Sequence, residues 1–419
     1  MIRRFAMTLL ALVACACASA EDPATPSPSP AAGPRFPFPQ HVTYATGTIR
    51  PSRRPQAEQD DDVRALYARW KSRYLANAGT ASDGSTLYRV SFGSGNPGRT
   101  VSEGQGYGMV IVALMAGHEP DARAIFDGLW RFALAHPSRI DARLMGWQVP
   151  ENGTADSAFD GDADIAYGLV LADRQWTSGG GIDYASAARR VRAGVLESTI
   201  GPQSRLPMLG DWTDPHGSPH NQYTPRSSDF MPDHFRAFAR FTGDAAWSEV
   251  VARSQAVVTT LQERYAPTTG LLPDFAVAKS ATDHAPQPAP AGFLEGPNDG
   301  AYWYNACRDP WRLGTDALQS GDPVSLAQVR RIARWLRAST GGDPARMASG
   351  YRLDGRPIQT DFFTTAFAAP LAVALMSDPE AQAFLDDAYD AVRNHPEDYY
   401  EDSLALQSLL VLTGNSWAP

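Results

Sequence analysis

The sequence has 419 residues, of which 43% are hydrophobic and 20% are charged, and its formal net charge at pH 7 is −9. This composition is typical of a globular protein that is long enough for one large domain or two ordinary ones. The negative charge argues against nucleic acid and anionic membrane surfaces as partners.

The first 20 residues have the pattern of an export signal. Arg3 and Arg4 provide a basic start, residues 5–14 form a short apolar segment, and residues 18–20 (ASA) form a small-residue cleavage site. The apolar segment is too short to span a bilayer. We therefore expect an exported protein, and residues 1–20 form no part of the expected fold.

A second pattern in the signal concerns its destination. Residues 12–15 (LVAC) also resemble a bacterial lipobox, in which Cys15 would become the lipidated first residue. We expect either a periplasmic or outer-membrane lipoprotein or a secreted protein, and the lipid anchor would be its only contact with a membrane. Cys15 and Cys17 both lie in the signal, which leaves Cys307 without a disulfide partner.

The composition divides the rest of the chain into two parts. Residues 21–40 are rich in Pro, Ala and Ser, and residues 21–60 are therefore predicted to be a tether and N-terminal extension. No similar linker follows. Residues 61–419 are predicted to form a single catalytic domain, and the protein is expected to be a monomer.

That domain is predicted to be all-α. Apolar residues recur at helical spacing in twelve segments, and no alternation of apolar and polar residues is long enough to predict a sheet. Six inner and six outer helices that alternate along the chain would form an α/α toroid. The predicted helices are 62–77, 104–117, 120–135, 162–173, 183–200, 229–242, 244–265, 301–319, 324–339, 361–377, 380–395 and 399–413.

Three long connections carry Trp, Asp and Gly residues. They are residues 138–160, 201–228 and 266–300. Neighbouring helices usually need only short connections. Long loops that carry such side chains on a helical scaffold indicate one functional face.

Two acidic residues stand at the starts of apolar helices. Glu103 lies in the segment 102–108 (SEGQGYG), and Asp160 lies in the segment 158–166 (AFDGDADIA). An acid in apolar surroundings is costly unless it has a function, and two separated carboxylates are the minimal equipment for cleaving a glycosidic bond. The glycines around Glu103 would let a sugar chain approach closely. Ser102 and Gln105 have capping-box spacing.

These segments resemble glycoside hydrolase family 8. Four motifs occur in the order found in that family, over roughly residues 60–415. They are 102–108 (SEGQGYG), 144–147 (LMGW), 158–166 (AFDGDADIA) and 308–312 (RDPWR). The resemblance implies an (α/α)6 barrel and an inverting mechanism on β-1,4-linked glycans.

The resemblance also indicates one branch of the family. Asn305 stands where many members carry the catalytic-base Asp, and Phe159 stands where a small hydroxyl residue is usual. The branch with Asn holds chitosanases, lichenases and some endoglucanases, and it takes its base from a Glu in the preceding loop. Here that residue would be Glu295, and residues 227–232 (SSDFMP) also resemble this branch.

These considerations predict three catalytic residues. Glu103 is the general acid, with a pKa raised by its apolar surroundings. Asp160, by resemblance, holds the sugar in a distorted ring at the cleavage point and helps to position water. Glu295 is the base, on the far side of the sugar ring. Asp162 and Asp164 are expected to be structural, because acids are common in a first helical turn.

Further residues are predicted to contact the substrate. Pyranose rings lie flat on aromatic side chains, and polar groups bind their hydroxyls, although Asp229 and Arg312 could instead form salt bridges between helices. The predicted substrate-binding residues are Tyr107, Trp147, Trp212, Tyr223, Asp229, Trp303, Asn305 and Arg312. No metal and no cofactor are expected: His216 and His220 have ligand spacing, but proline and glycine prevent a regular helix there.

The expected function is exported, endo-acting hydrolysis of a β-1,4-linked polysaccharide. Chitosan is favoured by acids in or beside the functional loops, followed by β-1,4-glucan and, as an alternative, mixed-linkage β-glucan. The acids are Asp156, Asp211, Asp214, Asp229, Asp233 and Asp299. The remaining alternative is a non-catalytic, glycan-binding surface lipoprotein, which would be favoured if Glu295 did not reach the site of Glu103.

Overall fold

The computed structural model describes residues 33–151, 153–177 and 181–419. The predicted signal, the lipobox and the first part of the tether lie outside the described residues. The described part contains twelve α-helices, as predicted. Their bounds are α1 Gln56–Tyr74, α2 Ser102–Leu114, α3 Ala122–Ala135, α4 Phe159–Trp176, α5 Tyr184–Ser198, α6 Pro232–Thr242, α7 Ala246–Tyr265, α8 Asp309–Ser320, α9 Pro323–Thr340, α10 Thr365–Leu375, α11 Gln382–Arg393 and α12 Tyr399–Leu412.

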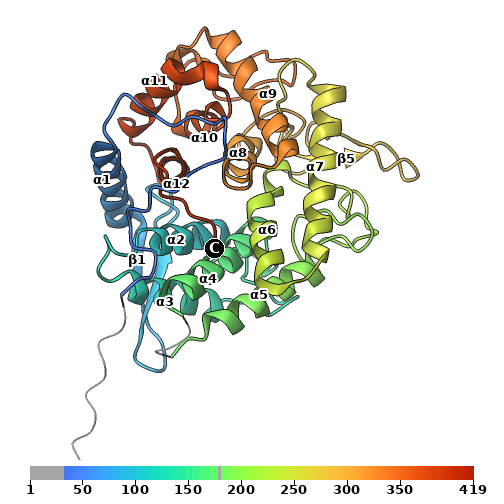
Figure 1. Ribbon diagram of the computed structural model, residues 1–419. Helices are drawn as coiled ribbons and strands as arrows, with labels where there is room; N and C mark the ends of the chain where they lie inside the picture. Colours follow the sequence, from blue (N-terminus) through green and yellow to red (C-terminus); the bar gives the residue numbers. More distant parts are fainter. Residues whose placement is uncertain (1–32, 152, 178–180) are drawn as a thin grey trace, which may run out of the picture. The chain divides into compact units, whose positions relative to one another are not determined.

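The helices alternate between an inner and an outer ring (Figure 1). The even-numbered helices α2, α4, α6, α8, α10 and α12 each contact the next, and α12 contacts α2, so that the inner ring is closed. Helices α3, α5, α7, α9 and α11 each pack on the outside against the inner helix that precedes them in the chain, and α1 packs against α12. This arrangement is an (α/α)6 barrel, and it confirms the predicted fold.

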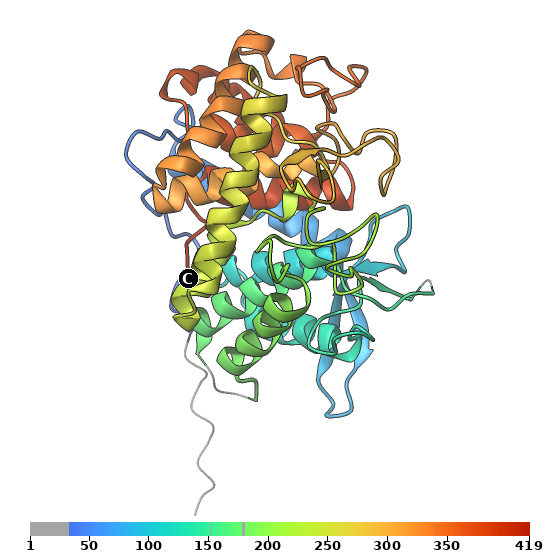
Figure 2. The same cartoon turned by 90° about the vertical axis from the view of Figure 1, so that its right-hand side faces the viewer.

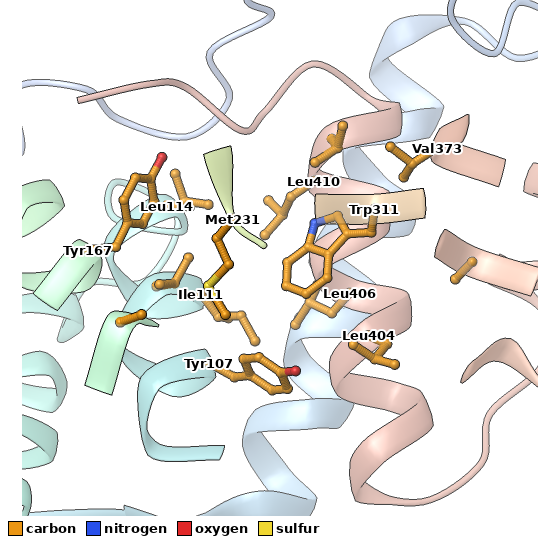
Figure 3. Close-up of a cluster of buried hydrophobic side chains, with 14 of the residues drawn as sticks. Tyr107, Ile111, Leu114, Tyr167, Met231, Trp311, Val373, Leu404, Leu406 and Leu410 are labelled. Atoms are coloured by element: carbon orange, nitrogen blue, oxygen red, sulfur yellow. The ribbon is translucent and has the colours of Figure 1, made fainter. Parts of the chain in front are cut away.

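The composition of the helices explains which ring they join. All residues of α10 are buried, and so are nearly all those of α2, α4 and α12. A helix that is apolar on every side must be surrounded by others, whereas amphipathic helices such as α3 and α9 can face solvent on one side. Figure 3 shows a part of the apolar core, in which Met231 and Tyr107 lie between Ile111 on one side and Trp311 and Leu406 on the other.

Short strands, which were not predicted, connect parts of the helical scaffold. Three antiparallel pairs occur: β1 (Leu75–Thr80) with β2 (Thr86–Val90), β3 (Thr100–Val101) with β4 (Gln148–Val149), and β5 (Ala276–Ala278) with β6 (Pro286–Pro288). The predicted helix 62–77 therefore ends early, at Tyr74, where the β1–β2 hairpin begins. The β3–β4 pair holds the start of α2 against the loop that carries Trp147.

The prediction of a tether is wrong from residue 33 onward. Phe38 is buried in the core, and Phe36 stacks on Trp417 with ring centroids 4.5 Å apart. The backbone N–H of Phe36 also donates to the side chain of Gln175. Burial of these aromatic rings stabilises the packed segment, and residues 33–55 run along the domain.

The long loops gather on one side of the domain, as predicted. Figure 2 shows the connections α3–α4, α5–α6 and α7–α8 on the right of the view, with the C-terminus on the left. Every helix in the described part of the chain falls short of the length and apolar character needed to cross a membrane.

Candidate active site

Helices α2 and α4 approach each other closely, and this brings the two predicted acids Glu103 and Asp160 together. A Cβ atom on Gly106 would lie 2.9 Å from the backbone oxygen of Gly161, and one on Gly161 would lie 2.5 Å from the carbonyl carbon of Ser102. Side chains do not fit at such distances. These glycines therefore serve the packing of one helix on another, and not the approach of a sugar chain.

The start of α2 is fixed differently from the predicted capping box. The side-chain oxygen of Ser102 has no hydrogen-bond partner in the described residues, and the N-cap residue is Val101. The Gln105 side chain instead accepts from the N–H of Val90 and donates to the carbonyl of Leu129. The prediction was wrong because backbone groups of β2 and α3 lie within reach of Gln105.

Arg308 connects the two acids. Its Nη1 donates to Oε2 of Glu103 at 2.7 Å and to Oδ2 of Asp160 at 2.7 Å. The hydroxyl of Tyr399, at the start of α12, donates to the other oxygen of Glu103 at 3.1 Å. The side chain of Arg308 is 1% exposed and that of Glu103 is 17% exposed. Of this ion pair, Glu103 is therefore the residue that reaches solvent.

Arg226 connects Asp160 to Glu295. Its Nη1 lies 3.0 Å from Oδ2 of Asp160, and its Nη2 lies 3.8 Å from Oε1 of Glu295. The other oxygen of Asp160 accepts from the N–H of Gly161. The Glu295 side chain is 51% exposed. The predicted base therefore lies in the same group of side chains as the predicted acid.

Asn305 closes a ring of contacts between the predicted acid and base. Its Nδ2 donates to Oε2 of Glu295 at 2.8 Å, and its Oδ1 accepts from Nη2 of Arg308 at 3.1 Å. Oxygen Oδ1 of buried Asp274 accepts hydrogen bonds from the N–H groups of Trp303, Asn305 and Ala306. These bonds fix the turn that carries Asn305. An aspartate at position 305 could not donate to Glu295, so the amide is the group that suits a glutamate base.

The surroundings of the two motif acids move their pKa values apart. Burial raises the pKa of Glu103, and the negative charge of Asp160 adds to this, although Arg308 opposes both. Burial also disfavours charge on Asp160, but Arg226 and Arg308 outweigh it and hold its pKa well below the usual range. Glu103 is thus suited to carry a proton that it can donate, and Asp160 is suited to stay ionised.

Tyr399→Phe should move the alkaline limb of the pH profile to higher pH. The hydroxyl of Tyr399 donates to Glu103 and so favours its ionised form, which lowers the pKa of Glu103. Without that donor the pKa of Glu103 rises, and the acid stays protonated to higher pH. The measurement is kcat/KM as a function of pH, which reports the free enzyme. A shift of this limb toward lower pH would contradict the assignment.

Two predicted substrate-binding residues are buried, and these predictions were wrong. Tyr107 is fully buried, with its ring against the edge of Trp311 (Figure 3). Asp229 is also fully buried, neither of its oxygens has a hydrogen-bond partner in the described residues, and burial raises its pKa to about 7. Both side chains face the barrel interior, because their segments are enclosed by inner helices.

Arg312 is likewise unavailable to a sugar. Its two Nη atoms donate to the two oxygens of Asp164 at 2.9 and 2.6 Å, and both side chains are buried. His234 lies 2.8 Å from the same carboxylate, so that one ion network ties α4, α6 and α8 together. The alternative of a salt bridge between helices is confirmed. Asp164 is structural, as predicted, and so is Asp162, which accepts the N–H of Met145.

Three predicted aromatic residues lie beside the site. The backbone of Trp147 pairs with the first residue of α2, one position before Glu103. Trp212 is 36% exposed, and its loop is bonded to the start of α4, where the N–H of Phe159 donates to Leu209. Trp303 is half-buried and lies two residues before Asn305. Trp212 is the most accessible of the three for stacking on a sugar.

Tyr223 lies elsewhere. It lines a surface groove together with residues of the outer helix α7, and its ring stacks on His284. Within the described residues it makes no contact with the ring of side chains around Arg308. Tyr223 therefore lies apart from the side chains around Arg308, and its contact with substrate stays a prediction.

Four site residues were not predicted: Arg226, Arg308, Asp274 and Tyr399. Arg308 lies in one of the four motifs, but its partners are 148 and 205 positions away in the chain. Contacts over such separations leave no local pattern. In the described part of the chain, no three His, Cys, Asp or Glu side chains gather in a way that could hold a metal ion.

The fold is a closed double ring of helices, and its site holds carboxylates that are joined by buried arginines. Together they define a glycoside hydrolase of the (α/α)6 class. The chain belongs to the glycosyl hydrolases family 8, whose sequence profile matches residues 59–414. This confirms the family predicted from the motifs.

The chain is similar to several characterised members. It is 40% identical to a "Beta-glucanase" from Niallia circulans, over 92% of each chain, and 37% identical to an "Endoglucanase" from Bacillus sp. (strain KSM-330), over 91% of this chain and 82% of that one. The apo structure of a β-1,3-1,4-glucanase from Paenibacillus sp. X4 is similar to this one, with 40% sequence identity and a TM-score of 0.87. The match covers 92% of this chain and all of that one. Rex8A from Paenibacillus barcinonensis, at 22% identity and a TM-score of 0.70, shares the fold.

Proposed function

We propose that the protein is an inverting, endo-acting β-glucanase that hydrolyses mixed-linkage β-1,3-1,4-glucan and β-1,4-glucan. The observation that carries the proposal is the ring of contacts in which Arg308, Asp160, Arg226 and Asn305 join Glu103 to Glu295. An inverting enzyme needs two carboxyl groups on opposite sides of one sugar ring, with room for a water molecule between them.

The proposed roles follow from the surroundings of each carboxyl group. Glu103, with its raised pKa, protonates the leaving oxygen. Glu295 takes the proton of the attacking water: one of its oxygens is held by Asn305, and the other accepts no hydrogen bond in the described residues. Asp160 is held ionised by two arginines and cannot readily take a proton, so its negative charge stabilises the positive charge that develops on the sugar.

The surroundings of the loop aspartates support a neutral glucan over chitosan. All six acids that favoured chitosan have partners within the chain or are buried. Asp214 accepts the N–H of His216, and Asp156 bonds to Thr154. Asp211 accepts from Ser138 and Ser157, and Asp299 accepts three N–H groups of its own loop. Asp233 bonds to His234, and Asp229 is enclosed. A site for a polymer of ammonium-bearing sugars would need such carboxylates to be free.

The substrate is tested by comparing kcat/KM on mixed-linkage β-glucan, carboxymethyl cellulose and chitosan. We expect the highest value on mixed-linkage β-glucan and little turnover of chitosan. Proton NMR of the first products should show inverted anomers, because water attacks from the side opposite to the leaving group. Retained configuration would contradict the mechanism, and a preference for chitosan would contradict the substrate.

Export is part of the proposal, because a polymeric glucan is degraded outside the cell. The signal pattern of residues 1–20 supports it. Lipidation of Cys15 is the form we favour, and mass spectrometry of the mature N-terminus tests it: an unmodified chain that begins at Glu21 would exclude the anchor.

A further inference from the structure

A second groove lies on the surface, apart from the catalytic carboxylates. Its volume is about 350 Å³, which is within the range of small-ligand sites. Four parts of the chain form its walls: residues 203–206, Tyr223, the outer helix α7, and the segment of the β5–β6 hairpin. Figure 1 shows β5 beside α7, at the periphery of the double ring.

Two stacked rings form one wall of this groove. The Tyr223 and His284 rings lie 3.8 Å apart at an interplanar angle of 23°. The backbone of Tyr223 is fixed, because its N–H donates to the side chain of Asn221 at 2.9 Å. Pro286 extends the apolar part of the wall. Rigid aromatic surface is what the C–H face of a pyranose ring packs against, and little conformational entropy is lost in using it.

The opposite walls supply hydrogen-bonding groups on a fixed backbone. Gln203 and Thr260 line the groove, together with Arg253, whose guanidinium has no ion pair or hydrogen bond in the described residues. The turn that carries Gln203 is anchored, because its N–H and that of Ser204 both donate to the side chain of Gln222. The backbone of the turn is therefore held in place, and the guanidinium of Arg253 is available to a ligand. The Thr260 hydroxyl donates to the carbonyl of Ala256, so it can only accept a hydrogen bond from a ligand.

The charge of the groove selects among ligands. No carboxylate is among its lining residues, and Arg253 contributes a positive charge on a chain whose net charge is −9. A polymer that carries ammonium groups would be repelled there, whereas the hydroxyl groups of a neutral glycan would be bound. Aromatic stacking combined with hydroxyl-binding groups and no acid matches a neutral polysaccharide.

We propose that this groove is a second binding site for a neutral β-glucan chain. The proposal rests on the proposed function, since it takes the polymer that the catalytic site cleaves as the ligand of the groove. A chain held there keeps its other segments close to Glu103 and Glu295, which raises their effective concentration at the catalytic site. The groove thus favours long polymers over short oligosaccharides.

Binding is tested in the full chain with the Glu103→Gln substitution, which prevents hydrolysis during the measurement. Mobility in gels that contain soluble mixed-linkage β-glucan gives the dissociation constant. Tyr223→Ala and His284→Ala should each weaken binding about three- to tenfold, the loss expected for one aromatic stack. The matched control is Tyr88→Ala, which removes a partly buried tyrosine of the β1–β2 hairpin and should bind as the parent does.

A kinetic measurement separates this inference from the proposed function. With Glu103 intact, Tyr223→Ala should lower the ratio of kcat/KM on polymer to kcat/KM on a short oligosaccharide by a similar factor. An unchanged ratio and unchanged mobility, in a variant whose thermal unfolding matches the parent, would overturn the second site and leave the β-glucanase proposal standing. Absence of β-glucan hydrolysis by the unaltered protein would overturn both.

Discussion

Glu103→Gln should lower turnover of β-glucan by several decades while the protein still binds the polymer. The amide has the shape of the carboxyl group but cannot donate a proton to the leaving oxygen, and proton donation of this kind contributes about 10²–10⁴-fold to rate. The hydrogen bond from Arg308 can still be accepted by the amide oxygen, so the surrounding ring of contacts persists. The loss therefore falls on kcat and not on KM.

The dependence on the leaving group sharpens this test. A substrate with an aryl leaving group of low pKa needs little protonation, so Glu103→Gln should lose much less activity on it than on the polymer. Glu119→Gln is the matched control: Glu119 is also a buried acid, but it pairs with Lys71 and Tyr67 far from the site. The Glu119→Gln substitution should lower thermal stability and leave catalysis intact. Turnover near that of the unaltered protein in Glu103→Gln would end the assignment.

The fold could be predicted because it depends on local patterns. The helical spacing of apolar residues located all twelve helices. Their number and the four motifs together predicted the double ring. The β1–β2 hairpin was missed because residues 75–90 carry no long alternation of apolar and polar side chains. The N-terminal segment was misread because its prolines outweigh Phe36 and Phe38 in composition, although these two rings decide where it packs.

The site could be predicted only where a motif marks it. Glu103 and Asp160 stand in glycine-rich segments, and Glu295 was found through the amide at Asn305. The arginines that hold them come from other parts of the ring, and nothing near Arg226 in the sequence indicates that it meets Asp160, 66 positions away. Residues such as Tyr107 and Arg312 looked like site residues because a motif contains both exposed and buried side chains, and only the packing separates them.

Glu295→Ala should be nearly inactive and still folded. The side chain is half-exposed and makes one hydrogen bond, to Asn305, so its removal leaves no buried cavity. Without a base the attacking water keeps its proton, and turnover should fall by about 10²–10⁴-fold. A small anionic nucleophile such as azide needs no base, and it should restore cleavage with inversion at the anomeric carbon. Glu151→Ala, which removes another exposed loop carboxylate, is the control and should keep its activity.

Asn305→Asp tests why this chain pairs an amide with its glutamate. The new carboxylate would stand 2.8 Å from Glu295 and 3.4 Å from Asp274, where the amide now donates to both. The two facing carboxylates would repel each other and displace Glu295 from the position that the amide now holds, so kcat/KM on β-glucan should fall. For the preceding test, full activity of Glu295→Ala would show that another group acts as the base. A kcat/KM equal to that of the unaltered protein in Asn305→Asp would show that the amide is not needed to position Glu295.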